Sequence, residues 1–297
     1  MSASKVSQQK LPSAPAVLLL GAPGAGKTYS IGTLAKRRKI IYVFTDPGGD
    51  ESLIDSCRAH GVSISNLHWH YLPPVSDGWG TLQEMTDKVN MMNYDGLTKL
   101  QGINKSDHKQ FYNIVGVMSN FVCQRSGKAL GNVCELDPME YAVVFDSLTG
   151  LNKIARDTTV GAKPTMHQGE WGVAMSLEET FIRQFVADIR CPRVMIGHVE
   201  RQTDEVAGRI TFLVSLLGNK LAPQIPHLFS DVIFASTEGG KFQWATMDDR
   251  IALKTRNLEL KGKLPPDFEP IVDRWEQRIK EAQESIFEQH QEQADGA

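Results

Sequence analysis

A glycine-rich loop near the amino terminus has the residue types and the spacing of a phosphate cradle. Residues 21–28 have the sequence GAPGAGKT, which fits the pattern G-x-x-x-x-G-K-[ST]. Glycines let the backbone turn tightly, so that successive N–H groups converge on a phosphate at the start of a helix. We expect Lys27 to reach the β- and γ-phosphates of ATP and the Thr28 hydroxyl to ligate Mg²⁺. The expected cofactor-binding residues are Gly21, Ala22, Pro23, Gly24, Ala25, Gly26, Lys27, Thr28 and Tyr29.

A second candidate group is the carboxylate of Asp146, which follows the apolar run Tyr141–Phe145. A strand that ends in an acid delivers it to the carboxyl edge of a parallel sheet, where P-loop enzymes hold Mg²⁺, usually through a water. Thr28 and Asp146 are therefore the predicted metal site. The alternative is that Asp146 caps the helix that follows it.

Two acids in the sequence are candidates for the general base that activates water. Many P-loop ATPases place a glutamate directly after the metal-binding aspartate to activate water, but the residue here is Ser147. Another apolar run ends at Thr45 and is followed by Asp46 and, a few residues later, Glu51. We prefer Asp46 as the base because it is closest to the strand end, with Glu51 second. The alternative is that both are turn and helix-cap acids.

Short apolar runs rich in Val and Ile predict the strands that position these groups. Such runs are typical of strands buried on both faces, and they lie at 16–20, 40–45, 141–145 and 193–199. Helical patterns between them cover 27–38 and 176–189, and the second repeats an apolar residue every four positions. Strands that alternate with helices predict a parallel α/β sheet. A β-hairpin is expected over 231–246, with glycine at its turn.

Composition and patterning define the expected domains and compartment. We expect a flexible arm over 1–15, an ATPase domain over 16–260 with a mostly helical insertion at 73–138, and a polar C-terminal helix and tail over 261–297. The net charge of −3 excludes a global basic field, so a nucleic-acid surface must be a local patch. The first apolar run is too short for a signal sequence or a membrane span. We therefore expect a cytoplasmic protein without a membrane partner.

The P-loop, the strand-end Asp146-Ser147 pair and an acid after the second strand resemble the RecA-like branch of P-loop ATPases. The run 194–198 ends at His198, where RecA-like proteins carry a polar sensor of the γ-phosphate, although RecA itself has Gln there. The segments 221–226, 229–231 and 254–257 are similar to compact phage-encoded RecA-like ATPases, one branch of which is associated with single-strand annealing and recombination. The resemblance covers 16–260 apart from the insertion.

The resemblance implies a RecA-like fold and a Mg²⁺-dependent ATPase that acts in phage DNA recombination, repair or replication in the host cytoplasm. It implies binding of single-stranded DNA and self-association into a ring or filament, with a single-strand-binding protein as a further candidate partner. The segments 157–171 and 200–209 fall where recombinases place DNA-binding loops, and they carry Lys163, Arg201 and Arg209. Ordinary solvated loops are the alternative interpretation of both segments. Alternative functions are a nucleotide-gated loading module with little turnover and a helicase-type motor.

Lys254 and Arg256 are the expected source of further positive charge at the γ-phosphate. RecA-like assemblies insert basic residues from the adjacent protomer, and such residues accelerate phosphoryl transfer by several orders of magnitude. These two residues follow the predicted hairpin and alternate by two, so an extended segment would point both to one side. An ordinary solvated basic pair is the alternative.

Overall fold

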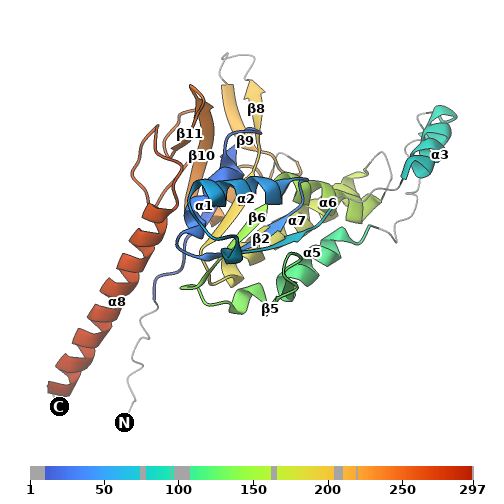
Figure 1. Ribbon diagram of the computed structural model, residues 1–297. Coiled ribbons are helices and arrows are strands. Elements are labelled where there is room, and N and C mark those ends of the chain that lie inside the picture. Colours follow the sequence, from blue (N-terminus) through green and yellow to red (C-terminus); the bar gives the residue numbers. More distant parts are fainter. Residues whose placement is uncertain are drawn as a thin grey trace, which may run out of the picture.

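The computed structural model describes residues 11–73, 78–93, 95–96, 108–161, 166–203, 210–218 and 220–295. Its centre is a seven-stranded sheet in the order β11-β10-β1-β7-β6-β2-β3 (Figure 1). All neighbouring strands are parallel except β10 and β11, which form an antiparallel hairpin. The strands are β1 Ala16–Gly21, β2 Lys39–Phe44, β3 Leu67–Tyr71, β6 Tyr141–Asp146, β7 Arg193–Gly197, β10 Asp231–Glu238 and β11 Lys241–Ala245.

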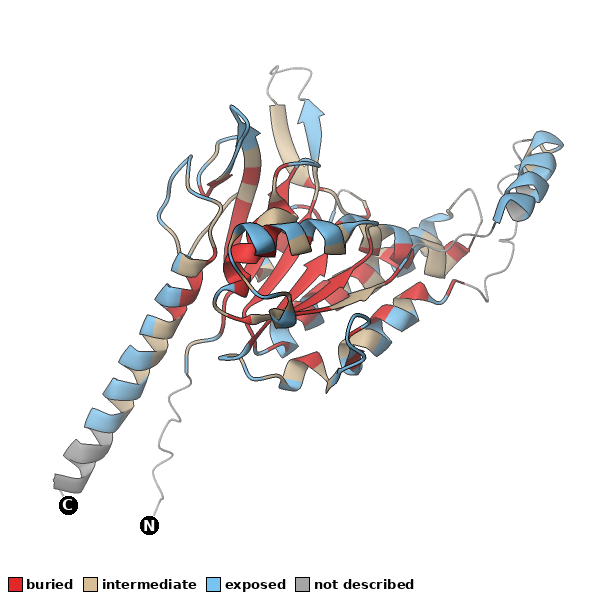
Figure 2. Ribbon diagram, in the orientation of Figure 1, coloured by how far each residue is buried: buried red, intermediate tan, exposed pale blue. Residues whose placement is uncertain are grey.

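Helices cover both faces of this sheet, and its central strands are buried (Figure 2). In β1, Leu18 and Leu20 belong to one hydrophobic core while Val17 and Leu19 belong to the other, as the two-residue period of a strand requires. The first core is completed by α5 Gln110–Ser119, α6 Leu148–Val160 and α7 Gln168–Asp188, and the second by α1 Lys27–Ala35 and α2 Gly49–Ala59.

This architecture confirms the α/β class and the mostly parallel central sheet flanked by helices, with a long C-terminal helix. All four predicted strands are present, and the predicted hairpin turns at Gly239 and Gly240, both with positive φ. Helix α7 begins earlier than the predicted residue 176, because a capping box between His167 and Glu170 starts it. Strand β3, with the sequence LHWHY, contains the short strand that the alternation of His68, Trp69 and His70 indicates.

Both segments proposed as DNA-binding loops contain regular structure, which corrects the expectation of simple loops. Asp157–Val160 is the last turn of α6, and α7 begins at Gln168. After β7 the chain forms an antiparallel hairpin of β8 Val199–Thr203 and β9 Ile210–Val214, which projects from the body (Figure 1). Arg201 is exposed on β8. Lys163 and Arg209 lie outside the described residues.

Short elements fill the described part of the segment 73–138. They are α3 Gly78–Asn90, helix α5, and a small antiparallel hairpin of β4 Phe121–Val122 and β5 Ala129–Gly131. Single turns of 3₁₀-helix occur at η1 Ile64–Asn66, η3 Val133–Glu135 and η4 Ile225–Leu228. Figure 1 shows α3 lying apart from the sheet, whereas Ile114 of α5 and Phe121 of β4 are buried in the first core.

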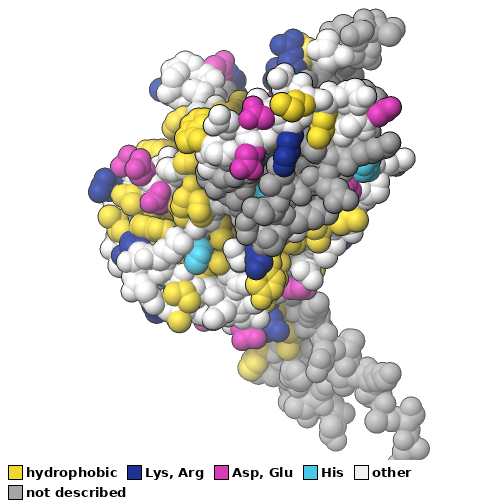
Figure 3. Space-filling model, turned by 90° about the vertical axis from the view of Figure 1, so that its right-hand side faces the viewer, with side chains coloured by type: hydrophobic (Ala, Val, Ile, Leu, Met, Phe, Trp, Pro, Cys, Tyr) yellow, Lys and Arg dark blue, Asp and Glu magenta, His cyan; other side chains and the backbone are white. Residues whose placement is uncertain are grey.

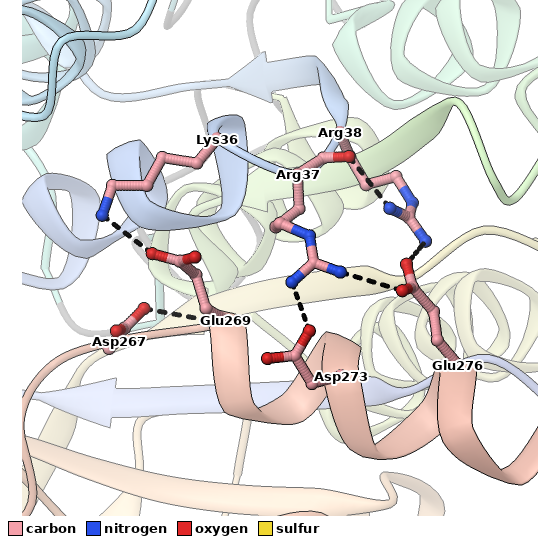
Figure 4. Close-up of polar contacts among 7 residues, drawn as sticks. All are labelled: Lys36, Arg37, Arg38, Asp267, Glu269, Asp273 and Glu276. Carbon is pink, nitrogen blue, oxygen red and sulfur yellow. Dashed lines mark hydrogen bonds and ion pairs between the residues drawn. The ribbon is translucent and has the colours of Figure 1, made fainter.

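Helix α8, Glu269–Asp295, is attached to the body by its first turns, and its later turns are largely exposed (Figure 2). Ile271 and Val272 are buried in the second core with residues of α1, and Trp275 is also buried. The basic run that follows α1 forms ion pairs with this helix (Figure 4): Lys36 with Glu269, Arg37 with Asp273 and Glu276, and Arg38 with Glu276. Within the described residues, no helix combines the length and the apolar composition needed to cross a membrane.

Candidate active site

The GAPGAGKT segment forms a tight loop between β1 and α1. Gly24 and Gly26 both have φ of 75°, a conformation that costs other residues energy. Gly21 lies against β10, where a Cβ atom would come within 2.4 Å of the Ala235 carbonyl oxygen. Gly26 caps α1 and has no side chain that could occupy the helix end. The loop therefore presents its backbone to a ligand at the amino end of a helix, which is the geometry of an anion site.

Lys27 carries a charge that this loop does not neutralise. Its Nζ donates hydrogen bonds to the carbonyl oxygens of Gly21 at 2.9 Å and Ala22 at 2.8 Å, and the residue is 6% exposed. Burial lowers the pKa of Lys27 to about 8, although Asp146 and Asp46 oppose the shift. A bound phosphate would supply the missing negative charge at short range.

Asp146 accepts two hydrogen bonds at the same oxygen. Thr28 Oγ1 and Tyr42 OH each donate to Asp146 Oδ2 at 2.8 Å. Burial raises the pKa of Asp146, and the hydrogen bonds from Tyr42 and Thr28 oppose that shift. The structure thus brings the two predicted metal ligands together, and a hydroxyl with a carboxylate is a donor set that suits Mg²⁺. Tyr42 was missed from the sequence, because a tyrosine inside an apolar strand resembles an ordinary core residue.

Asp46 lies at the carboxyl end of β2, beside the residue that follows Asp146. Ser147 Oγ donates to Asp46 Oδ2 at 2.9 Å and also accepts from the Gly150 N–H at the start of α6. Asp46 lines the cleft over the P-loop, whereas Glu51 is exposed on α2 and is not part of the cleft wall. The geometry therefore favours Asp46 over Glu51 as the acid facing a bound nucleotide.

His198 follows β7, the strand between β1 and β6 in the sheet. Its Nδ1 lies 3.4 Å from Lys27 Nζ. Burial lowers the pKa of His198, and the nearby ammonium of Lys27 lowers it further. A neutral imidazole at this place can accept from Lys27 or interact with a terminal phosphate group.

These groups share one cleft of about 580 Å³ at the carboxyl edge of the sheet. Its walls are the P-loop with Tyr29, the turn 46–49, Asp146, His198 and the exposed ring of Phe242 on β11. The Phe242 and Tyr29 rings lie 5.4 Å apart between centroids. Phe242 also covers Gly26, where a Cβ would come within 2.4 Å of its ring. The sequence offered no signal for Phe242, because only the hairpin fold places it here.

Lys254 and Arg256 lie at the other edge of the sheet. Lys254 bridges to Val232, near the beginning of β10, whereas the P-loop follows the end of the parallel neighbour β1. Lys254 Nζ donates to the His227 carbonyl oxygen at 2.9 Å. Burial and the nearby Arg256 lower the pKa of Lys254. Neither residue belongs to the cleft of its own chain, so a catalytic role requires a second chain.

Comparisons with known proteins leave the family unassigned. No protein-family model matches the chain, and no curated protein matches it. Several solved structures are similar, and two of them serve as examples. The flagellar accessory protein FlaH from Methanocaldococcus jannaschii has 12% identity over 79% of this chain and 77% of its own, with a TM-score of 0.32. An ATPase from the type III secretion system of pathogenic bacteria has 11% identity over 75% of this chain and 52% of its own, with a TM-score of 0.36. Likenesses this weak assign no activity.

Proposed function

We propose that the protein binds ATP with Mg²⁺ and hydrolyses it. One observation carries the proposal: a buried lysine without an ion-pair partner among the described residues sits inside a glycine-rich loop, and the hydroxyl of the next residue contacts a strand-end aspartate. Lys27 and Thr28 provide the first two groups, and Asp146 the third. The cleft above them is large enough for a nucleotide and has aromatic side chains in its wall.

Each residue has a defined part in phosphoryl transfer. The P-loop N–H groups and Lys27 would hold the β- and γ-phosphates, while Thr28 and Asp146 would hold Mg²⁺. The metal, when bound, neutralises the charge that develops on the phosphate oxygens. Asp46 orients or deprotonates the attacking water, which approaches in line with the bond that breaks. His198 contacts the γ-phosphate next to Lys27. The rate gain comes mainly from positioning and electrostatics.

We further propose that ATP turnover is linked to single-stranded DNA in recombination, repair or replication. The support is the resemblance to RecA-like recombinases together with the position of His198, which directly precedes β8. A movement of His198 when the γ-phosphate binds or leaves would therefore shift the β8–β9 hairpin, which carries Arg201. The DNA surface would be a local patch, because a net charge of −3 leaves no global basic field. On the face in Figure 3, the Lys and Arg side chains of the described residues lie apart from one another.

A nucleotide-gated module with little turnover is the second candidate. It is favoured by the hydrogen bond that Asp46 accepts from Ser147, because that carboxylate oxygen is already engaged by a hydroxyl instead of facing a water. Such a protein would bind ATP tightly and release it unhydrolysed.

The test is steady-state ATPase activity of the full chain, with and without single-stranded DNA, alongside nucleotide affinity. Stimulation by DNA supports the recombinase-type ATPase. Tight binding without turnover supports the module. In either case Lys27→Ala should abolish binding or turnover while the circular dichroism spectrum is unchanged. Unaltered activity in Lys27→Ala would exclude the proposed site.

A further inference from the structure

A second cavity lies at the amino edge of the sheet, opposite the P-loop. Its volume is about 360 Å³, and its walls come from the segment 12–16, the start of β7, the end of η4 and helix α8. Three arginines line it, namely Arg193, Arg256 and Arg278, together with His227. No carboxylate is among the lining residues in the described chain.

Arg193 is a buried cation without an acidic partner in the described part of the chain. It is 7% exposed, and its Nη1 donates to the carbonyl oxygens of Ala14 at 3.2 Å and Cys191 at 3.3 Å. Its Nε has no hydrogen-bond partner among the described residues. Burial lowers the pKa of Arg193 to about 10, and only the Cys191 thiol opposes this shift. A buried guanidinium with an unsatisfied N–H is costly unless an anion reaches it.

Arg278 is oriented toward the same place by neutral acceptors. Its Nη1 donates to Asn257 Oδ1 at 2.9 Å, and its Nη2 donates to the Arg256 carbonyl oxygen. Asp231 holds this segment in place, because it accepts from the N–H groups of Arg256 and Asn257 and from the Thr255 hydroxyl. Asp231 therefore organises the cavity wall without pairing with an arginine.

Several arginines elsewhere in the described part of the protein form ion pairs with acidic residues, whereas the three that line this cavity form none there. Arg37 and Arg38, at the other contact of α8 with the body, are paired with Asp273 and Glu276. Among the described residues, no carboxylate forms an ion pair with Arg193, Arg256 or Arg278. Residues 1–10, which precede this wall, contain no Asp or Glu.

We infer that this cavity is a second anion site, which binds a phosphate group between Arg193 and Arg278 with Arg256 at its rim. Planar guanidinium groups match phosphate oxygens in pairs, and the volume leaves room for an organic group attached to the phosphate. The phosphate belongs either to a small phosphorylated molecule or to the backbone of a single-stranded nucleic acid. The site requires neither the P-loop nor a second chain, and its two principal groups, Arg193 and Arg278, have no part in the proposed ATPase.

The test uses inorganic phosphate as the probe, titrated calorimetrically into the full-length Lys27→Ala variant at constant ionic strength. This background removes the main cation of the P-loop, which would itself bind phosphate. We expect one saturable site whose affinity does not depend on protein concentration. Adding Arg278→Gln should weaken binding by about tenfold or more, as removal of a charge-assisted pair does. Arg278→Lys should retain part of the affinity.

Arg274→Gln is the matched control, because Arg274 is exposed one turn earlier on α8 and bonds to Gln277 in the described structure. It should leave phosphate affinity unchanged. Absence of all phosphate binding in Lys27→Ala itself would overturn the inference, and so would equal affinity in Arg278→Gln and its control. Thermal unfolding of each variant, with equal midpoints expected, shows that a missing signal does not come from unfolding.

Competition then identifies the source of the phosphate. Displacement of the probe by a short oligothymidylate, but not by thymidine monophosphate, indicates a nucleic-acid backbone. Displacement by the monophosphate at equal or lower concentration indicates a small ligand. Each result supports the site. If either competitor displaced phosphate equally well from the variant with and without Arg278→Gln, the result would count against the site.

Discussion

Thr28 and Asp146 are 118 residues apart in the chain, yet the Thr28 Oγ1 donates a 2.8 Å hydrogen bond to the Asp146 Oδ2. This contact exists because α1 begins at the carboxyl edge of the sheet, where β6 also ends. One oxygen comes from a helix and the other from a strand, so their separation is set by the packing of α1 against the sheet. The two groups that the proposed metal site requires are therefore already in contact without a ligand.

The first prediction concerns this pair. Thr28→Val keeps the side-chain shape but removes the hydroxyl, and Asp146→Asn removes the charge. Both substitutions should lower the Mg²⁺ affinity of the nucleotide complex by about tenfold or more. Both should also reduce turnover more than they reduce the affinity for nucleotide measured without metal. Thr28→Ser is the control and should stay near wild type. The measurement is ATPase rate against Mg²⁺ concentration; equal curves for Thr28→Val and Thr28→Ser would contradict the assignment.

The burial of Lys27 predicts that nucleotide affinity depends on pH. Burial lowers the pKa of Lys27 in the free protein to about 8, so the ammonium loses its proton as the pH rises through that value. Bound phosphate favours the charged form, and binding above pH 8 must therefore take up a proton. Affinity should fall with rising pH by at most about tenfold per unit. Calorimetry in two buffers of different ionisation enthalpy measures the uptake directly.

The matched variant for this experiment is Lys27→Arg, whose side chain stays charged at all these pH values. Its affinity, even if weaker, should be flat over the same range. A wild-type affinity that is equally flat, with no proton uptake, would show that Lys27 stays protonated in the free protein.

Glu178 predicts a pH dependence of stability. This residue of α7 is fully buried, and burial raises its pKa to about 8 from 4.5. The native state therefore holds a proton that the unfolded state releases between these values, so stability falls as the pH rises from 4.5 to 8. Glu178→Gln keeps an acceptor for the Leu217 N–H and should raise the free energy of unfolding at pH 9 by about 2 kcal/mol.

The comparison is with Glu179→Gln, next to it on the same helix and paired with Arg183 at the surface. Urea unfolding at pH 5 and pH 9 measures both variants. The stabilisation by Glu178→Gln should shrink toward zero near pH 5, and Glu179→Gln should change little at either pH. An equal gain at both pH values would mean that ionisation of Glu178 is not the cause.

Lys254 and Arg256 predict that the active site is completed by a neighbouring chain. They lie at the edge of the sheet opposite their own P-loop, so they can act only in trans. ATPase activity per chain should rise with protein concentration, and Arg256→Ala should lower it by roughly 10³-fold. A mixture of Arg256→Ala with Lys27→Ala should recover activity, because one interface then joins an intact P-loop to an intact Arg256.

The control mixture replaces the Lys27→Ala partner by the double variant Lys27→Ala with Arg256→Ala. It cannot form an intact interface and should stay inactive. Activity that is independent of concentration, with no recovery in the first mixture, would show that each chain works alone.

The last prediction concerns single-stranded DNA. Substitution of Lys163, Arg201 and Arg209 by Ala should weaken binding and reduce the slope of log affinity against log salt by about 0.7 for each DNA phosphate that the variant no longer neutralises. Arg183→Ala, exposed on α7, should leave the slope unchanged. A persistent slope in the triple variant would place the DNA surface elsewhere.

Local sequence was enough to predict the glycine-rich loop, the buried strands and the proximity of Thr28 to Asp146. The loop is a short-range motif, so Gly21 to Thr28 specify their own conformation, and a run such as Tyr141–Phe145 is apolar on both faces wherever it occurs. An acid that follows such a run must reach the carboxyl edge of a parallel sheet. Thr28 and Asp146 could therefore be paired in advance.

Only the tertiary structure decided which other residues share these sites. Tyr42 reaches Asp146 because β2 and β6 are neighbours, and Phe242 covers Gly26 because the β10–β11 hairpin folds over the P-loop. Arg193 and Arg278 come from a strand start and a distant helix. Such contacts depend on strand order and helix docking, which arise from burial summed over the whole chain and leave no periodic or spaced signal near the residues themselves.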